Sequence, residues 1–200
     1  HYTLPADGAT TNTTVDERGA FAFGAPTAAS QMPRTGTGSF EGDFLAAMIA
    51  KTSDGATRQS SLLQWINGAT AVNVDFGSSQ LAMAFTGVVS PALSGGTIVA
   101  NSQLMVPSGS VFNATATATF DTAAQGFAGR FASAGFTSGG QTTAIDFRGI
   151  TPGSNAAGAS SIDGTFYGPD AVELGGSFRI VGGIPDQRVD ILGGFTGRRK

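Results

Sequence analysis

The fold is decided by GTFYGPDAVELGGSF, which occupies residues 164–178. Pro169 fixes its own φ angle and lacks an N–H group, so a strand that reaches it must stop there. Residues 170–174 are predicted to form one helical turn. Gly175-Gly176 then permits a sharp return into the strand that contains Phe178. The segment therefore predicts a strand–crossover–strand corner whose residues are structural rather than ligand-binding.

Apolar and polar residues alternate along much of the remaining chain, which is the period of a β-strand. One run places Phe40, Phe44 and Met48 on one face and Glu41 and Asp43 on the other. The predicted strands lie within residues 39–48, 71–76, 81–85, 115–120, 127–131, 145–149, 162–166, 178–181 and 189–195.

Sequences typical of turns lie between these runs. They occur at residues 54–55, 67–68, 77–79, 95–96, 138–140, 163–164, 182–183 and 185–186. Helical periodicity is scarce, although Leu62, Leu63 and Ile66 fit one helical turn. Short strands with Gly-rich turns favour a barrel or a sandwich. Inward glycines favour the barrel, because they relieve its tight corners. The prediction is an all-β fold, a soluble antiparallel up-and-down β-barrel of about eight strands.

The composition limits the classes of function. The chain has 30 Gly and 15 Phe, only 12% charged residues and a net charge of −3. Without a basic stripe, nucleic-acid binding has no electrostatic basis. The cluster at residues 198–200 is interpreted as a solvated tail end. No apolar run reaches the ~20 residues of a transmembrane helix. Because there is no Cys, disulfides and thiolate metal sites are excluded.

Residues 1–36 are predicted to form an irregular N-terminal arm or linker, and residues 37–200 the barrel. Thr, Ala, Gly and Pro dominate the arm, and only Ala20-Phe21-Ala22-Phe23 alternates. We expect that piece to be a short strand laid on the barrel. The chain begins at His1, so we expect it to be processed or truncated, and any signal peptide to be already removed.

The corner at residues 164–178, with the final strand ILGGFTGRR at 191–199, resembles the C-terminal barrel of transferrin-binding protein B and its relatives. These include factor H-binding, haemoglobin-binding and hemophilin-type proteins. Gly38-Ser39-Phe40-Glu41-Gly42 resembles the first barrel strand of the family, and Val74-Asp75-Phe76-Gly77 its VDFG hairpin.

The resemblance implies a bacterial, lipoprotein-like protein on the outer-membrane surface of a Gram-negative bacterium, or one released extracellularly. It implies export through an outer-membrane translocator and capture of iron, haem or host factors. Larger relatives have a separate handle domain before the barrel, for which 36 residues are too few. The mature lipoproteins of the family begin with a lipidated Cys, which this chain lacks, so we expect either that the anchor was removed or that the protein is released.

Catalytic and metal chemistry have little support in the residues. The single His, His1, lies at the terminus, so a Ser-His-Asp triad is not expected. Haem would need an axial ligand from His1, a Tyr or one of four Met residues (Met32, Met48, Met83 and Met105). Glu41 and Asp43 fit a solvated outer face better than a glycosidase pair or a Ca²⁺ site. We predict no enzyme activity, no catalytic residue and no metal site.

Trp65, Phe21 and Phe23 are the candidate binding residues. Trp65 is the only Trp, and it either packs in the core, which we favour, or anchors an interface. The first functional hypothesis is an exported, solute-binding or host-protein-binding module that takes a protein partner or a small ligand. The second is a structural subunit of an extracellular or membrane-associated assembly, in which the arm contacts a neighbour.

Overall fold

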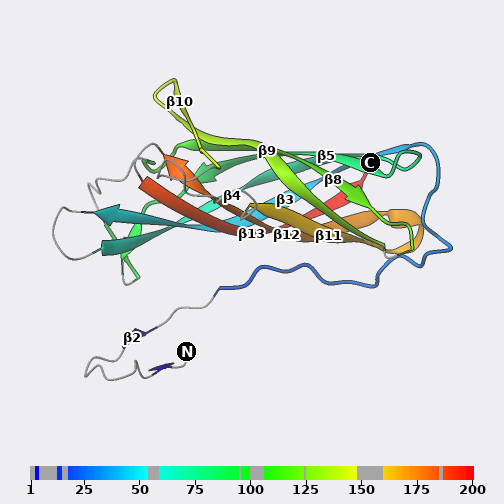
Figure 1. The fold of residues 1–200 in the computed structure, drawn as a ribbon, viewed down its shortest axis with the longest axis horizontal. Coiled ribbons are helices and arrows are strands. Elements are labelled where there is room, and N and C mark those ends of the chain that lie inside the picture. The colour runs from blue at the N-terminus through cyan, green and yellow to red at the C-terminus, as the bar shows by residue number, and fades with distance from the viewer. Residues whose placement is uncertain are drawn as a thin grey trace.

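The computed structural model describes residues 3–4, 13–14, 18–53, 59–94, 96–99, 106–123, 125–147, 160–184 and 187–200, which are nearly all strand (Figure 1). Eight strands form the main sheet: β3 (Thr37–Ser53), β4 (Gln59–Asp75), β5 (Gln80–Val89), β8 (Val111–Phe120), β9 (Gly126–Ser138), β11 (Ser161–Tyr167), β12 (Glu173–Ile184) and β13 (Gln187–Arg199).

These eight strands close into a barrel. Each is antiparallel to the one that follows it, and β13 pairs with β3 to complete the wall. The predicted all-β, up-and-down, eight-stranded barrel is confirmed. The short strands β6 (Leu93–Ser94), β7 (Thr97–Ile98) and β10 (Gln141–Ala144) attach to it, and β1 (Thr3–Leu4) pairs with β2 (Thr13–Thr14). The first barrel strand begins at Thr37, and the division into residues 1–36 and 37–200 stays a prediction.

Phenylalanine fills the inside of the barrel. Phe85 is 1% exposed, and its ring centroid lies 5.2 Å from that of Phe178 and 5.5 Å from that of Phe44. The buried phenylalanines are Phe40, Phe44, Phe76, Phe85, Phe112, Phe120, Phe127, Phe131, Phe136, Phe166, Phe178 and Phe195. Because these rings pack against one another across the barrel, its interior is a packed core and not a channel.

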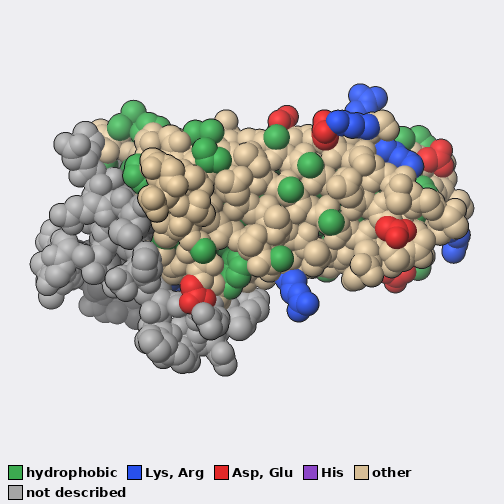
Figure 2. Space-filling view, turned by 90° about the horizontal axis from the view of Figure 1, so that it is seen from above, with side chains coloured by type: hydrophobic (Ala, Val, Ile, Leu, Met, Phe, Trp, Pro, Cys, Tyr) green, Lys and Arg blue, Asp and Glu red, His purple; other side chains and the backbone are tan. Residues whose placement is uncertain are grey.

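The outer face of the barrel wall carries small and uncharged side chains over much of its area. In β5 and β8, buried and exposed residues alternate strictly, and the exposed ones are Ala, Thr, Val, Asn and Gln. In Figure 2, most charged side chains on the face shown gather towards one end. No helix in the described part of the chain is long and apolar enough to cross a membrane.

Several predicted turns are instead strand interior. Asn67-Gly68 lies in β4, Asp163-Gly164 in β11 and Gly182-Gly183 in β12. A Cβ on Gly68 would lie 2.1 Å from the carbonyl oxygen of Thr86 on the neighbouring strand. Glycine is therefore needed at this position because the two strands lie close together, and not because the chain reverses there.

Other predicted reversals are confirmed. Gly77-Ser78-Ser79 connects β4 to β5, and Gly139-Gly140 connects β9 to β10, both with positive φ. At the first reversal the Asp75 carboxylate accepts hydrogen bonds from the N–H groups of Gly77 (2.9 Å) and Ser78 (3.2 Å). Hydrogen bonds from the Ser78 side chain and from these backbone groups hold the pKa of Asp75 below its usual value. The predicted turns at 54–55 and 185–186, and the first residue of 95–96, lie outside the described residues.

The motif corner differs in detail from the prediction. Its helical part is one 3₁₀ turn, Pro169–Ala171, entered through Gly168 at φ 72°. Gly175-Gly176 lies inside β12 and makes no return. A Cβ on Gly176 would lie 1.9 Å from the carbonyl oxygen of Asp163, so the lack of a side chain at Gly176 permits β12 to lie close to β11.

Three further interpretations are corrected. Residues 59–66 continue β4 as a strand, which replaces the helical turn suggested for Leu62, Leu63 and Ile66. Residues 145–147 make only an isolated bridge, at Asp146, so the predicted strand there is wrong. The basic C-terminus is solvated at Arg198 and Lys200, as interpreted, but it is not a tail: Arg199 lies in β13 with its guanidinium 5.4 Å from the Phe76 ring centroid, and Lys200 forms an ion pair with Glu41.

Candidate functional site

Residues 18–27, which we call the strap, lie along the outer wall of the barrel. Figure 1 shows this part of the chain running beside the barrel before it turns at the far end towards β3. The strap forms no strand, so the strand predicted for Ala20–Phe23 is wrong. Its one β-bridge joins Pro26 to Tyr167 at the end of β11.

The FYGP part of the motif anchors the strap. The Thr27 N–H donates to the Phe166 carbonyl oxygen (2.9 Å), and the Gly168 N–H donates to the Ala25 carbonyl oxygen (3.0 Å). The Thr27 hydroxyl donates to the Gly168 carbonyl oxygen (2.7 Å). The Tyr167 hydroxyl donates to the Ala22 carbonyl oxygen (3.1 Å), so it bonds to the strap and not to Glu173, its neighbour across the ladder. The motif therefore has a structural role in holding the strap, and that its residues bind no ligand stays a prediction.

Glycines on the barrel wall make room for the strap. A Cβ on Gly175 would lie 2.8 Å from the Cβ of Ala22, and one on Gly194 would lie 3.7 Å from the Cβ of Ala20. A side chain at Gly175 would therefore push the strap away from the wall, whereas a Cβ at Gly194 would make an ordinary van der Waals contact.

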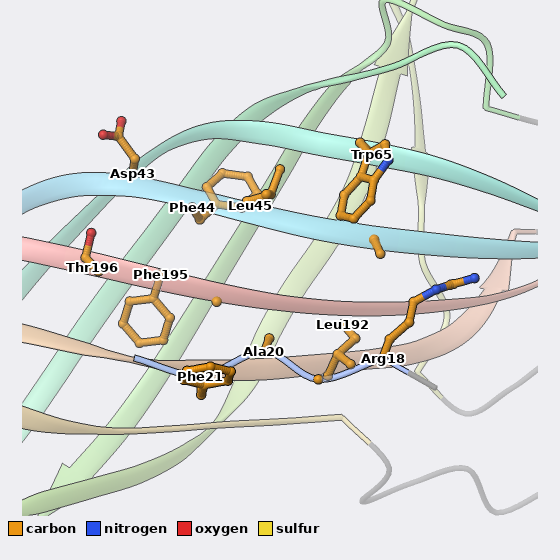
Figure 3. A pocket seen from close by; sticks show the side chains of 13 residues that line it. Arg18, Ala20, Phe21, Asp43, Phe44, Leu45, Trp65, Leu192, Phe195 and Thr196 are labelled. Carbon is orange, nitrogen blue, oxygen red and sulfur yellow. The ribbon is translucent and has the colours of Figure 1, made fainter. Parts of the chain in front are cut away.

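A groove of about 670 Å³ lies between the strap and the strands β13, β3 and β4. Its floor carries apolar side chains, and the strap borders it at Arg18, Gly19, Ala20 and Phe21 (Figure 3). The floor residues include Leu45, Ala47, Trp65 and Leu192.

The strand register explains why these residues meet. Leu192 on β13 lies opposite Ala47 on β3, which lies opposite Trp65 on β4. Leu45, two positions from Ala47, points to the same face because side chains on a strand alternate. Leu45 is 54% exposed and Trp65 is 40% exposed, so the groove presents apolar surface to water.

Each end of the groove has one charged side chain. Figure 3 shows Arg18 and Asp43 at opposite ends, with the apolar floor between them. Neither forms an ion pair with another residue in the described ranges. A second hollow of about 480 Å³ continues along the strap from Ala22 to Ala25 and is lined by Glu41, Glu173 and Arg198.

The candidate binding residues are now placed. Trp65 is on the outer wall, so the preference for a core position was wrong. Phe21 borders the groove at 77% exposed, and Phe23 borders the second hollow at 88% exposed. Their rings lie 6.3 Å apart. Whether these residues bind a ligand stays a prediction.

The candidate catalytic and metal-binding residues that the structure describes lie outside the groove or inside the core, apart from Asp43 at one end of the groove. Glu41 and Asp43 are exposed on the outer face of β3, as predicted. Met32, Met48 and Met83 are buried in the core, while His1 and Met105 lie outside the described residues. Among the residues that the structure describes, no three His, Asp or Glu side chains gather as a metal site would require.

A family model assigns the barrel. The model described as the C-lobe and N-lobe β-barrels of Tf-binding protein B matches residues 32–199. The chain belongs to this family. The family resemblance inferred from the FYGP corner is thus confirmed. The strap, residues 18–27, lies outside the matched region. No curated protein matches the chain.

Solved structures of transferrin-binding protein B match over most of this chain and, in the first two cases below, over less than a third of their own length. A mutant of the vaccine antigen from Haemophilus parasuis Hp5 has 20% identity and a TM-score of 0.47, over 87% of this chain and 29% of that one. Intact Ap-TbpB, with N and C lobes, has 21% identity and a TM-score of 0.40, over 88% and 29%. A mutant from Actinobacillus pleuropneumoniae H49 has 14% identity and a TM-score of 0.39, over 88% and 66%. With TM-scores below 0.5, these likenesses add nothing to the assignment.

Proposed function

We propose that this transferrin-binding protein B-family chain is a non-enzymatic binding module, which captures a protein ligand on its outer wall. The groove beside the strap carries the proposal. It exposes Leu45 and Trp65 next to the apolar Ala47 and Leu192. Large apolar side chains exposed together on one concave surface are typical of binding sites, and Trp is the residue type most enriched at binding hot spots.

The packed core supports an outer-wall site. Rings such as Phe85 and Phe178 occupy the space that a lumenal ligand would need. Met48 and Met83 are buried among them, which argues against a methionine-ligated haem in the groove. A protein ligand is therefore the better candidate than a small molecule inside the barrel.

Membership of the family supports a proposal for location and role. We propose export through an outer-membrane translocator to the surface of a Gram-negative bacterium, or release from it. We further propose that the captured protein carries iron or haem, or is another host factor. Transferrin, which the related structures name, is the first ligand to test.

The test is binding of iron-loaded and iron-free transferrin to the immobilised chain, followed by capture from serum. A captured protein should bind at least tenfold more weakly to Trp65→Ala, since each tenfold corresponds to about 1.4 kcal/mol. Val172→Ala is the control, because Val172 is 37% exposed and lies at the motif corner. An absorbance scan of the captured material would reveal a haem Soret band. Equal binding by the Trp65 and Val172 variants would refute the groove as the capture site.

A structural subunit is the second candidate. Phe21 and Phe23 expose 77% and 88% of their surface on the strap, where a neighbouring subunit could cover them. Sedimentation velocity on the chain and on the double variant Phe21→Ser/Phe23→Ser distinguishes the two proposals. An assembly that dissociates in the double variant supports a subunit, and a monomer at high concentration rules it out.

A further inference from the structure

The strap brings a free backbone edge to the groove. Gly19, Ala20 and Phe21 border the groove, and their backbone groups form no hydrogen bond with any residue in the described ranges. Peptide groups in an extended segment without a partner strand can pair with an added strand. The groove is thus bordered by three residues whose backbone groups have no hydrogen-bond partner among the described residues, beside an apolar floor.

The same outer wall already holds one extended chain. The strap runs above β13 and β12, with Ala20 above Gly194 and Ala22 above Gly175. It is held by backbone contacts with the motif corner and by few side-chain contacts. This part of the wall therefore suits a chain in extended conformation.

The floor sets the size and pattern of a second extended chain. Asp43 to Ala47 are five residues of β3, and the four steps between them cover roughly 13 Å at ~3.3 Å per residue. A segment of about five residues fits this length. Alternate side chains of an extended segment point to the same side, so two or three of them would face Leu45 and Trp65.

The charges at the two ends set the direction preferred by the ligand. Arg18 favours an acidic residue at one end of the segment, and Asp43 favours a basic residue at the other. Both charges lack an ion pair among the described residues, so neither has a partner there to displace.

We propose that the groove binds an extended segment of a protein partner by strand addition to Gly19–Phe21, with alternate apolar side chains against Trp65 and Leu45. The segment carries an acidic residue near Arg18 and a basic residue near Asp43. This inference rests on the proposed capture of a protein ligand and names the form in which that ligand is recognised.

The test uses a fluorescein-labelled probe peptide, Lys-Thr-Phe-Thr-Leu-Thr-Glu, with both ends blocked. Fluorescence anisotropy measures its affinity, and the emission of Trp65, the single Trp, reports occupancy of the groove. Three matched peptides serve as controls. Two have N-methyl groups on alternate amides, one peptide for each register, so that one of the two lacks the N–H groups that would bond to the strap, and the third has Ser in place of Phe and Leu.

We expect the probe to bind and to shift the Trp65 emission to the blue. Binding should be at least tenfold weaker for one of the two N-methylated peptides, for the Ser peptide, and for the probe with the Trp65→Ala variant. Arg18→Glu, on the exposed strap, should weaken binding about threefold to tenfold, and a probe with Lys in place of its terminal Glu should restore it. Equal affinity for the N-methylated peptide on both alternate registers would overturn strand addition.

The outcomes separate this inference from the proposed function. If no probe peptide binds while capture of an intact protein still depends on Trp65, the recognition mode is wrong and the capture site stands. If a captured protein binds equally well to Trp65→Ala, the proposed function fails as well.

Discussion

Removal of the ring at Phe85 is expected to destabilise the barrel strongly. The side chain is 1% exposed at the centre of the interior. Besides Phe44 and Phe178, it faces Phe131 at 6.1 Å and Phe195 at 5.6 Å between ring centroids. Rings on several sides of the barrel therefore lose a partner in Phe85→Ala.

The size of the effect follows from this packing. Phe→Ala in a core costs about 3–5 kcal/mol, as the lost transfer free energy plus the cost of the cavity. Because rigid strands hold the four neighbouring rings in place, little collapse is available, and we expect about 4–5 kcal/mol. For a domain of this size, that corresponds to a Tm lower by about 10–15 °C.

Urea unfolding followed by far-UV circular dichroism measures the loss in free energy of unfolding. The matched control is Phe21→Ala, since Phe21 is 77% exposed, and its effect should stay within about 0.5 kcal/mol. The m value should be unchanged in both variants, because the fold is the same. Benzene should partly restore the stability of Phe85→Ala, since an apolar cavity binds such ligands.

A loss below about 1.5 kcal/mol for Phe85→Ala would contradict dense packing around this ring. The interior would then be loosely packed, and a ligand inside the barrel would have room.

Three further predictions concern the strap and one exposed turn. Tyr167→Phe removes the hydrogen bond to Ala22, worth about 1 kcal/mol, so amide exchange in the strap should be about fivefold faster while the exchange of the barrel strands is unchanged. Gly175→Val places carbon atoms where Ala22 lies, so thermolysin should cleave the strap faster than in the native chain; equal cleavage would contradict the packing. The pKa of Asp75 is lowered in the folded state, so its stabilisation is present above about pH 4 and lost as the pH falls through the lowered value. Asp75→Asn should therefore lose less stability than the native chain between about pH 7 and pH 3 in urea titrations.

Local patterns predicted the strands well, because burial on one face is recorded directly in the alternation of residues. Leu81, Met83 and Phe85 alternate with small residues and form β5 with that facing. Asx-Gly pairs were less reliable. Gly68 lacks a side chain because the carbonyl oxygen of Thr86, on the neighbouring strand, occupies the space. The Asn67-Gly68 dipeptide alone gives no indication of that neighbour.

The candidate site was harder to predict than the fold, because it depends on register and distant contacts. Trp65 and Leu192 share a face only through Ala47 on the strand between them. No local sequence pattern marked Leu45 or Arg18 as residues of the candidate site. The strap is anchored to Tyr167 across 145 positions of sequence, and no pattern within either segment indicates that contact.

The seam between β3 and β13 has a consequence for when the molecule can fold. It joins residues as distant as Phe40 and Arg199, and closing a loop of that length costs on the order of 4 kcal/mol of chain entropy. Until β13 is present, β3 and β12 each have an unpaired edge that other chains can join. The wall is therefore completed only when its last strand, β13, has been synthesised, and the sheet stays open at both edges until then.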